Sequence, residues 1–287
     1  MKLRAVLAVL VLILAAGASV ALEWPTGVFR PERLFGQRSA GVFESSLVLQ
    51  DAETVRAAGH GRMLLTLSPG GFNGGFPGTL GEAVILVHED GLMTIYGNLK
   101  QDSLLVEQGG IEARALIGQG GASGWARTGS LLFQVMDRQR GTLLNPLLLL
   151  PAFRDTRQPQ IRNVVAVSSN GQSIALSSVR TLRQGRWALY ADISDTIDGI
   201  TGEFAPFRIT TTINGTEQST IPYETLRTEN GRLVISSEAV SSETLYRDPA
   251  RIYLGTVSLV RGRADIAIYC RDLTGNERSQ SFPLIIE

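Results

Sequence analysis

The sequence predicts a mainly β protein with two domains, and three observations support this fold class. Its length of 287 residues is enough for about two domains. After residue 22, nearly every apolar segment is short, alternates with polar residues or is β-branched, and ends at Gly, Pro, Asn or Asp. Hydrophobic residues make up 44% of the chain and charged residues 19%, which allows a packed core. Because no long segment beyond the N-terminus has a helical period, helix should be scarce.

The first 21 residues have the layout of a secretory signal peptide. Lys2 and Arg4 precede an apolar run over 5–16, and residues 19–21 are the small residues Ser-Val-Ala. The alternative is an uncleaved anchor, because residues 5–22 are 18 positions without a charge. No cysteine lies near this junction, which excludes a lipoprotein anchor. We therefore expect an exported, periplasmic or extracytoplasmic protein that touches the membrane only if residues 5–22 are retained.

Short alternating runs predict the strands, and Asn-Gly pairs predict the turns between them. Asn214-Gly215 directly follows an alternating run and is a strong hairpin signal, while Asn170-Gly171 and Asn230-Gly231 are weaker ones. The clearest predicted strands cover residues 83–87, 131–135, 207–213 and 264–269.

A change of composition near residue 155 predicts the domain boundary. Glycine is dense over 70–81 and 118–129, whereas Ser, Thr and alternating strands dominate after residue 155. We therefore predict one domain over 25–155 and another over 156–287. Regular strand spacing in the second domain is typical of an immunoglobulin-like β-sandwich, and residues 272–276 look like its last hairpin turn.

Three segments of the first domain carry motifs in a defined order. Residues 41–49 read GVFESSLVL, and residues 84–99 read VILVHEDGLMTIYGNL. Residues 128–135 read TGSLLFQV, with spaced glycines before them and Asn145-Pro146 after them. Together these segments resemble the M23 (LytM- and lysostaphin-type) zinc peptidases over roughly residues 27–150. The resemblance implies an antiparallel LytM-like β-sheet domain.

The same resemblance implies that the family's chemistry is missing. It places the first zinc-ligand histidine at Glu44, the aspartate ligand at Val48 and the last histidine ligand at Leu132. The two catalytic histidines fall at Asn98 and Ser130. Valine and leucine have no lone pair for a metal, and the chain has two histidines where the family uses four. We therefore expect no zinc, no other cofactor and no peptidase activity.

Four further residues of this domain are predicted contacts of a remaining groove. They are His88, Tyr96, Phe72 and Phe76. His88 also has a simpler interpretation as a hairpin histidine hydrogen-bonded to backbone, and His60 is expected on a surface turn. The glycine-rich stretch around Phe72 lacks the Gly-Lys-Ser/Thr ending of a phosphate-binding loop, so a flexible hairpin is favoured.

Two features of the second domain are predicted to be structural. Asp192, Asp195 and Asp198 are spaced by three, whereas calcium loops generally space carboxylates by two, which favours a solvated turn over a calcium site. The single cysteine of the mature chain, Cys270, is expected to be a small buried hydrophobe.

The resemblance implies a noncatalytic envelope protein, a pseudoenzyme that binds peptidoglycan peptide or regulates a cell-wall hydrolase. One alternative is an active peptidoglycan metalloendopeptidase with a rearranged zinc site, and another is a purely structural envelope protein. Lys plus Arg and Asp plus Glu both number 27, so no charge excess indicates nucleic acid as a partner.

Overall fold

The structure is a computed structural model that describes residues 22–68 and 78–287. The predicted signal peptide over 1–21, and Phe72 and Phe76, lie outside the described residues. In the described ranges no helix is long and apolar enough to cross a membrane. The predicted mainly β class is confirmed, and in this part of the chain helix is restricted to α2 (Ser242–Leu245) and two 3-10 turns, η1 (Pro146–Leu148) and η2 (Leu176–Ser178).

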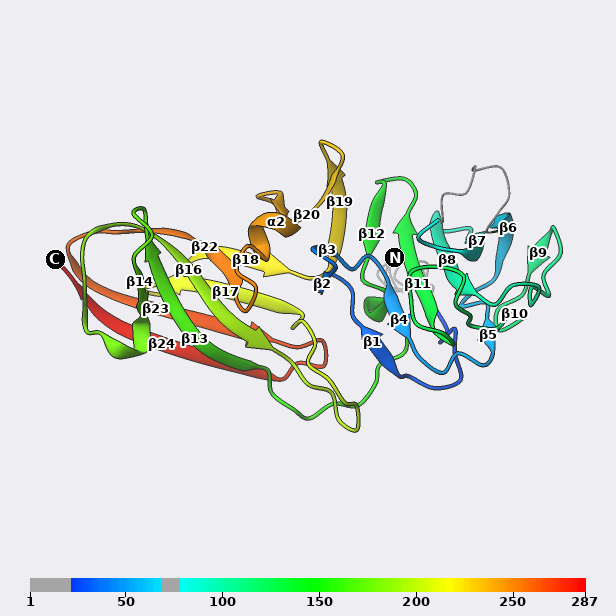
Figure 1. Cartoon of the computed structure of the whole chain (residues 1–287), viewed down its shortest axis with the longest axis horizontal. Helices are drawn as coiled ribbons and strands as arrows, with labels where there is room; N and C mark the ends of the chain where they lie inside the picture. Colours follow the sequence, from blue (N-terminus) through cyan, green and yellow to red (C-terminus); the bar gives the residue numbers. More distant parts are fainter. Residues whose placement is uncertain (1–21, 69–77) are drawn as a thin grey trace, which may run out of the picture.

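The N-terminal domain is built on an antiparallel ladder in the order β12-β11-β8-β7-β6-β9 (Figure 1). Strand β4 pairs with the first part of β11, next to the part that pairs with β12. The strands of this domain are β1 (Pro31–Arg33), β2 (Arg38–Ser39), β3 (Val42–Phe43), β4 (Leu47–Leu49), β5 (Val55–Arg56), β6 (Gly61–Leu67), β7 (Glu82–Val87), β8 (Leu92–Leu99), β9 (Gly110–Ile111), β10 (Leu116–Gly118), β11 (Leu131–Asp137) and β12 (Thr142–Leu144).

Side-chain alternation along β11 divides the sheet into two faces. Leu131, Phe133 and Val135 are fully buried in the domain core, together with Tyr96 of β8. Leu132 lies between them on the opposite face, which is the face that matters for the predicted site.

The C-terminal domain is a sandwich of two sheets around a shared core. One sheet has the order β14-β13-β16-β22 and the other β15-β24-β23-β17-β18. The predicted turns at Asn214-Gly215 and Asn230-Gly231 are confirmed, with positive φ at all four residues. The strands are β13 (Gln160–Ser168), β14 (Ser173–Ala175), β15 (Thr181–Leu182), β16 (Gly185–Ser194), β17 (Arg208–Ile213), β18 (Thr216–Pro222), β19 (Thr225–Glu229), β20 (Arg232–Ile235), β21 (Val240–Ser241), β22 (Ile252–Leu259), β23 (Gly262–Arg271) and β24 (Glu277–Ile286).

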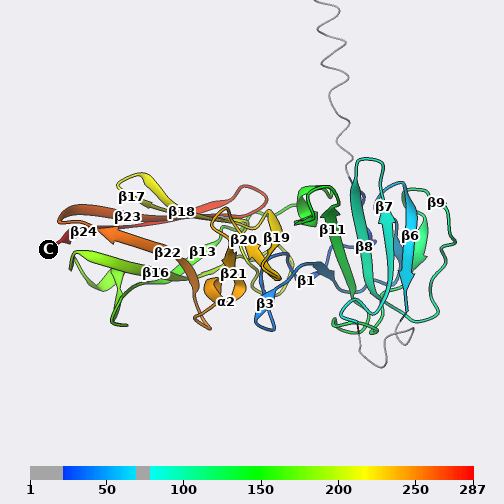
Figure 2. The same ribbon diagram turned by 90° about the horizontal axis from the view of Figure 1, so that it is seen from above.

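Strands β19, β20 and β21 leave this sandwich and extend the sheet of the N-terminal domain, which no sequence pattern predicted. Strand β19 pairs with β12, with Thr142 opposite Arg227 and Leu144 opposite Thr225. The result is an 11-stranded sheet that crosses the boundary between the domains (Figure 2). Residues from both domains also contribute to each core, so the two domains are joined by packing as well as by pairing.

Candidate functional site

The five positions that resemble zinc-ligand and catalytic positions lie close together where β4, β8 and β11 meet. We call Glu44, Val48, Asn98, Ser130 and Leu132 the M23-like site. All five side chains are buried. Val48 of β4 lies directly opposite Leu132 of β11, and Leu132 lies opposite Gly97 of β8. The fold thus places Val48 beside Leu132, and the Asn98 side chain bonds to the carbonyl of Ser130.

Val48 and Leu132 fill the centre of the M23-like site with hydrocarbon. Val48 is fully buried and Leu132 is nearly so. Direct cross-strand neighbours on one face are close enough for side-chain packing. Neither side chain has an atom that can donate a lone pair to a metal, so this part of the site can contribute packing but not coordination.

Glu44 is the one remaining residue that could hold a cation, and its carboxylate is already paired. The Nε atom of Arg33 donates to its Oε2 at 2.7 Å, and the backbone N–H of Ser46 donates to its Oε1 at 3.1 Å. Arg33 thus supplies the positive charge that a buried carboxylate requires. These residues do not fit a zinc ion, because a single carboxylate already bound to protein donors cannot replace three ligands.

Asn98 fastens the loop that leads into β11. Its Nδ2 lies 2.9, 3.1 and 2.8 Å from the carbonyl oxygens of Gly121, Arg127 and Ser130, and its Oδ1 accepts from the N–H of Gly124 at 2.8 Å. At Gly121 an added Cβ would collide with the backbone of Lys100, and at Gly124 it would lie 2.7 Å from the carbonyl oxygen of Thr79. The loop can therefore pack this closely only with glycine at both positions. The amide therefore serves the backbone of the loop.

Ser130 joins the M23-like site to an ion-pair network on β1. Its Oγ donates to Glu32 Oε2 at 3.3 Å, and Glu32 is also paired with Arg33 at 3.0 Å and with Arg127 at 3.5 Å. Sequence reasoning missed Glu32 and Arg33 because no motif includes them. A Glu-Arg pair just before the first motif was the available signal.

His88 and Tyr96, two of the predicted groove contacts, are buried, and their polar atoms bond to residues of the same domain. His88 Nδ1 lies 2.7 Å from the carbonyl oxygen of His60, and Nε2 lies 2.8 Å from Thr94 Oγ1. The simpler interpretation of His88, a hairpin histidine bonded to backbone, is confirmed. The Tyr96 hydroxyl accepts from the N–H of Ala58 at 2.7 Å, and burial raises the pKa of Tyr96 to about 12. Both side chains stabilise the domain from within.

The ring of His88 nevertheless forms part of the wall of a surface pocket of about 410 Å³. Leu64 and Val87 give this pocket an apolar side, while Arg62, Glu89 and Arg138 give it charge. His60 lies at its edge, on the surface turn expected for it, 3.3 Å from Glu112. Because both ring nitrogens of His88 are already hydrogen-bonded, a ligand in the pocket would meet the other side chains.

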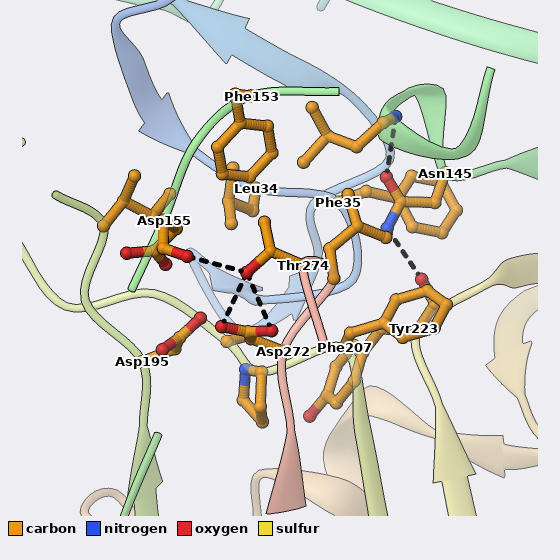
Figure 3. A pocket seen from close by; sticks show the side chains of 15 residues that line it. Leu34, Phe35, Asn145, Phe153, Asp155, Asp195, Phe207, Tyr223, Asp272 and Thr274 are labelled. Atoms are coloured by element: carbon orange, nitrogen blue, oxygen red, sulfur yellow. Dashed lines mark hydrogen bonds between the residues drawn. The ribbon is translucent and has the colours of Figure 1, made fainter. Parts of the chain in front are cut away.

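A second polar cluster lies at the junction of the two domains, around Asp155, Asp195 and Asp272. We call these three residues the aspartate cluster. One carboxylate oxygen of each lies within 4.8 Å of the others, and the three side chains face one another beside a small pocket (Figure 3). Asp195 is 5% exposed and Asp272 is 2% exposed. The prediction of a solvated turn at Asp195 is therefore wrong, because the side chain is buried at the junction of the two domains.

The other two predicted turn aspartates separate from Asp195. Asp192 pairs with Arg162 at 3.2 Å, and Asp198 pairs with Arg157 at 3.2 Å. Burial of Asp195, reinforced by the charges of Asp272 and Asp155, raises the pKa of Asp195 to about 7. Cys270 nearby is buried as predicted, and burial raises the pKa of its thiol.

Comparison with known proteins identifies relatives for part of the chain. A model of peptidase family M23 matches residues 46–146, and a separate family model matches residues 158–287. An uncharacterized protein of Treponema pallidum (strain Nichols) is 36% identical over 135 residues, covering 43% of this chain and 92% of that protein.

Solved structures that resemble part of the chain include two peptidases and a chain of a two-protein complex. A zinc-containing peptidase from Vibrio cholerae matches with 19% identity and a TM-score of 0.36, over 44% of this chain and 39% of that one. The lysostaphin catalytic domain from Staphylococcus simulans matches with 17% identity and a TM-score of 0.35, over 42% and 90%. A chain of the SpoIIIAH and SpoIIQ complex matches with 20% identity and a TM-score of 0.33, over 46% and 97%.

Proposed function

We propose, since the chain belongs to peptidase family M23 through residues 46–146, that its N-terminal domain works without metal as an extracytoplasmic binding module. Its role would be to regulate a cell-wall hydrolase or to hold peptidoglycan peptide. One observation carries the proposal: all five residues of the M23-like site are buried, and their polar groups are bound by the protein itself.

The chemistry of the site supports a noncatalytic role. A catalytic zinc needs three protein ligands and an open position for water. Val48 and Leu132 offer no ligand atom, and both oxygens of Glu44 accept hydrogen bonds from protein donors. Without a metal, an attacking water keeps a pKa far above neutrality and is a poor nucleophile.

A filled site favours recognition of a protein partner through the outer surface. Trp125 is 67% exposed on the loop that Asn98 fastens, and its backbone N–H donates to Thr79 at 3.0 Å. The loop therefore presents a large aromatic side chain on an anchored backbone. Tryptophan is enriched among the residues that contribute most of the binding energy at protein interfaces. We therefore expect the loss of Trp125 to weaken binding to a partner more than the loss of any other exposed residue of this loop.

Metal content and cleavage of wall peptide test the noncatalytic part of the proposal. The purified chain without residues 1–21 should contain far less than one zinc per molecule after incubation with zinc and dialysis. It should also leave purified wall peptides intact. Stoichiometric zinc together with cleavage would contradict the proposal and support the alternative of an endopeptidase with a rearranged site.

Binding experiments test the regulatory part. A pull-down from envelope extract should recover a cell-wall hydrolase, or sacculi should sediment with the protein. Trp125→Ala should reduce this binding at least about tenfold. Val260→Ala is the matched control, because Val260 is 77% exposed on the other domain. If the wild type binds neither hydrolase nor sacculi, the regulator is excluded and a purely structural role is supported.

A further inference from the structure

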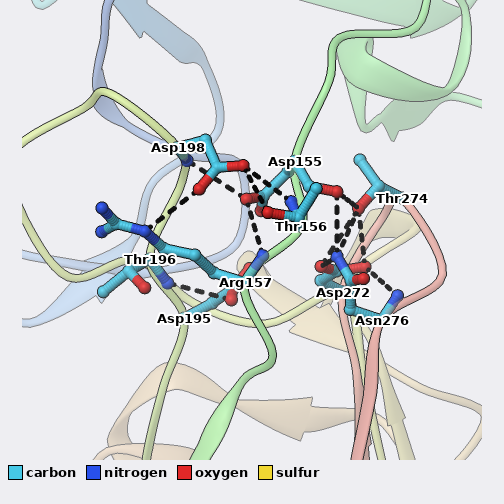
Figure 4. Close-up of polar contacts among 9 residues, drawn as sticks. All are labelled: Asp155, Thr156, Arg157, Asp195, Thr196, Asp198, Asp272, Thr274 and Asn276. Atoms are coloured by element: carbon cyan, nitrogen blue, oxygen red, sulfur yellow. Dashed lines mark hydrogen bonds and ion pairs between the residues drawn. The ribbon is translucent and has the colours of Figure 1, made fainter.

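The aspartate cluster joins three segments that are far apart in the chain. Asp155 lies on the connector between the domains, Asp195 follows β16, and Asp272 follows β23 (Figure 4). The carbonyl oxygen of Asp155 accepts from Asn276 Nδ2 at 3.2 Å, and Asp155 Oδ1 accepts from the N–H of Asp198 at 3.1 Å. The cluster is therefore part of the contact between the domains.

Asp195 is also the base of a loop that enters the N-terminal domain. Its backbone N–H and carbonyl bond to the carbonyl and N–H of Phe204 at 2.9 and 2.8 Å, which closes the loop over 195–204. Ile197 and Phe204 of this loop are buried in the core of the N-terminal domain. A change in charge at Asp195 acts directly on the segment that connects the two cores.

No basic side chain neutralises the aspartate cluster. Among residues 22–68 and 78–287, none of the three carboxylates forms an ion pair with Lys, Arg or His. Arg157 is nearby but pairs with Asp198. Like charges this close and this buried disfavour full ionisation, so a proton should be retained by one of the three.

The donors around the cluster indicate which carboxylate keeps the proton. Asp272 accepts from the N–H groups of Gly275 and Asn276 and from the side chains of Thr274 and Asn276. Asp155 Oδ1 accepts from two backbone N–H groups, of Arg157 and Asp198. In the described structure Asp195 accepts one hydrogen bond, from the N–H of Thr196 at 2.9 Å. Because donors stabilise the charged form, Asp195 is the least stabilised as an anion.

We propose that Asp195 is a proton-dependent latch: the junction is closed when its carboxyl is protonated, and ionisation loosens the loop over 195–204 from the N-terminal domain. The raised pKa of Asp195, about 7, supports this assignment. The latch is a property of the junction between the domains and does not depend on the proposed binding function.

Several other ionisable groups lie around Asp195. The other ionisable residues that line the pocket are Asp155, Asp272 and Tyr223, and the Cys270 thiol is close enough to be affected by the charges of Asp195 and Asp272. Burial raises the pKa of Tyr223 and of Cys270, so both stay neutral. Apart from Asp155 on the connector, the side chains that the N-terminal domain contributes to the pocket lining are uncharged: Leu34, Phe35, Asn145, Leu147 and Phe153.

A bound proton fits the cluster better than a bound calcium ion. The adjoining cavity is about 20 Å³, room for about one water molecule. Calcium takes about six to eight oxygen ligands, whereas most lone pairs of Asp155 and Asp272 face protein donors.

The sign of the effect follows from proton linkage. The pKa of Asp195 is about 7 in the closed junction and would return toward its ordinary value of 3.8 when the junction opens. Opening between these values releases a proton, so closure is weakened as pH rises toward 7 and is constant above it. The opening equilibrium of the loop should increase roughly tenfold from about pH 6 to about pH 8.

Amide hydrogen exchange of the full chain tests the latch, after correction for the intrinsic pH dependence of exchange. Amides of 195–204 should lose about tenfold protection between about pH 6 and about pH 8 in the wild type. Asp195→Asn mimics the protonated form and should keep high protection at both values. Asp192→Asn, on the strand β16 that precedes Asp195 but outside the cluster, should behave like the wild type. Equal wild-type protection at both values, or a wild-type pH dependence in Asp195→Asn, would overturn the proposal.

Two further measurements keep the test decisive if Asp195→Asn does not fold. Carboxyl ¹³C NMR of the wild type should give Asp195 a titration midpoint near 7, and a midpoint near 3.8 would overturn the latch. The exchange experiment is then repeated with calcium chloride or with EDTA. Protection restored at about pH 8 by stoichiometric calcium would replace the latch with a metal site, and no effect of calcium supports the latch.

Discussion

The M23-like site and the aspartate cluster are both buried and both contain carboxylates, yet they differ in whether a basic side chain balances the negative charge. At the M23-like site, Glu44 faces Arg33, and the amide of Asn98 is fully hydrogen-bonded. At the aspartate cluster, three carboxylates share one space, and none of them pairs with a basic side chain within residues 22–68 and 78–287. The first region should thus be stabilised by each of its polar residues, whereas the second should be stabilised by losing a charge.

Asn98→Ala should produce the largest loss of stability. The substitution removes the side-chain partner of the Ser130 carbonyl and of the Gly124 N–H, both in the loop over 121–130. The carbonyls of Gly121 and Arg127 lose one hydrogen bond each and keep those from the N–H groups of Gly129 and Ser130. We expect the free energy of unfolding to fall by about 3 kcal/mol, measured by urea denaturation.

Asn163→Ala is the control for Asn98→Ala, because Asn163 also has positive φ but is exposed. It isolates the cost of the backbone conformation. If both variants lose the same stability, the hydrogen bonds of Asn98 contribute nothing measurable to the stability of the fold.

Arg33→Met should be the next most damaging change. It leaves the buried carboxylate of Glu44 without its cation, so the free energy of unfolding should fall by about 2 kcal/mol. Adding Glu44→Gln should recover part of the loss, because the unpaired charge is then removed. Arg30→Met, which breaks an exposed pair with Asp51, should cost less than about 1 kcal/mol. If Arg33→Met loses no more free energy of unfolding than Arg30→Met, the buried carboxylate of Glu44 does not need Arg33 for stability.

Asp155→Asn should have a smaller effect of the opposite sign. The amide oxygen can still accept from the N–H groups of Arg157 and Asp198, while one charge leaves the aspartate cluster. At about pH 8 the free energy of unfolding should rise by about 1 kcal/mol, and the pKa of Asp195 should move down. Thermal unfolding at that pH measures the change, and a destabilised variant would remove the contrast between the two regions.

Asp137→Asn should have the smallest effect on the free energy of unfolding, and this effect should depend on pH. Hydrogen bonds from the N–H groups of Arg140 and Gln139 and the charge of Arg140 lower the pKa of Asp137. A lowered pKa stabilises the fold above the ordinary value of 3.8, and this contribution is lost as pH falls through the folded pKa. Acid unfolding should therefore begin at slightly higher pH in Asp137→Asn than in the wild type. This trend is opposite to that of Asp195, and an unchanged acid transition would contradict it.

Local patterns were sufficient to predict the strands and the turns. The run over 207–213 and the Asn214-Gly215 pair became β17 and its hairpin turn because alternation and turn chemistry act over neighbouring residues. Motif spacing also assigned Val48 and Leu132 to one site, and the register between β4 and β11 places these two residues side by side.

Partners from distant segments could not be predicted in this way. Arg33 reaches Glu44 only because β1 pairs with β4, and the pairing of β19 with β12 depends on how two sheet edges meet. Asp195 was expected to be solvated, since nothing in its own neighbourhood shows that Asp155 and Asp272 will lie next to it. Burial and charge pairing depend on the whole fold, whereas alternation does not.

The sequence by itself determined that this is a β protein and that hydrocarbon occupies two positions of the M23-like site, because periodicity and side-chain chemistry are properties of the residues alone. Only the tertiary structure decided that Glu44 is neutralised by Arg33, that Asn98 holds a loop, and that three aspartates meet between the domains. Those outcomes depend on distance and on exclusion from water, which arise when segments far apart in the chain pack together.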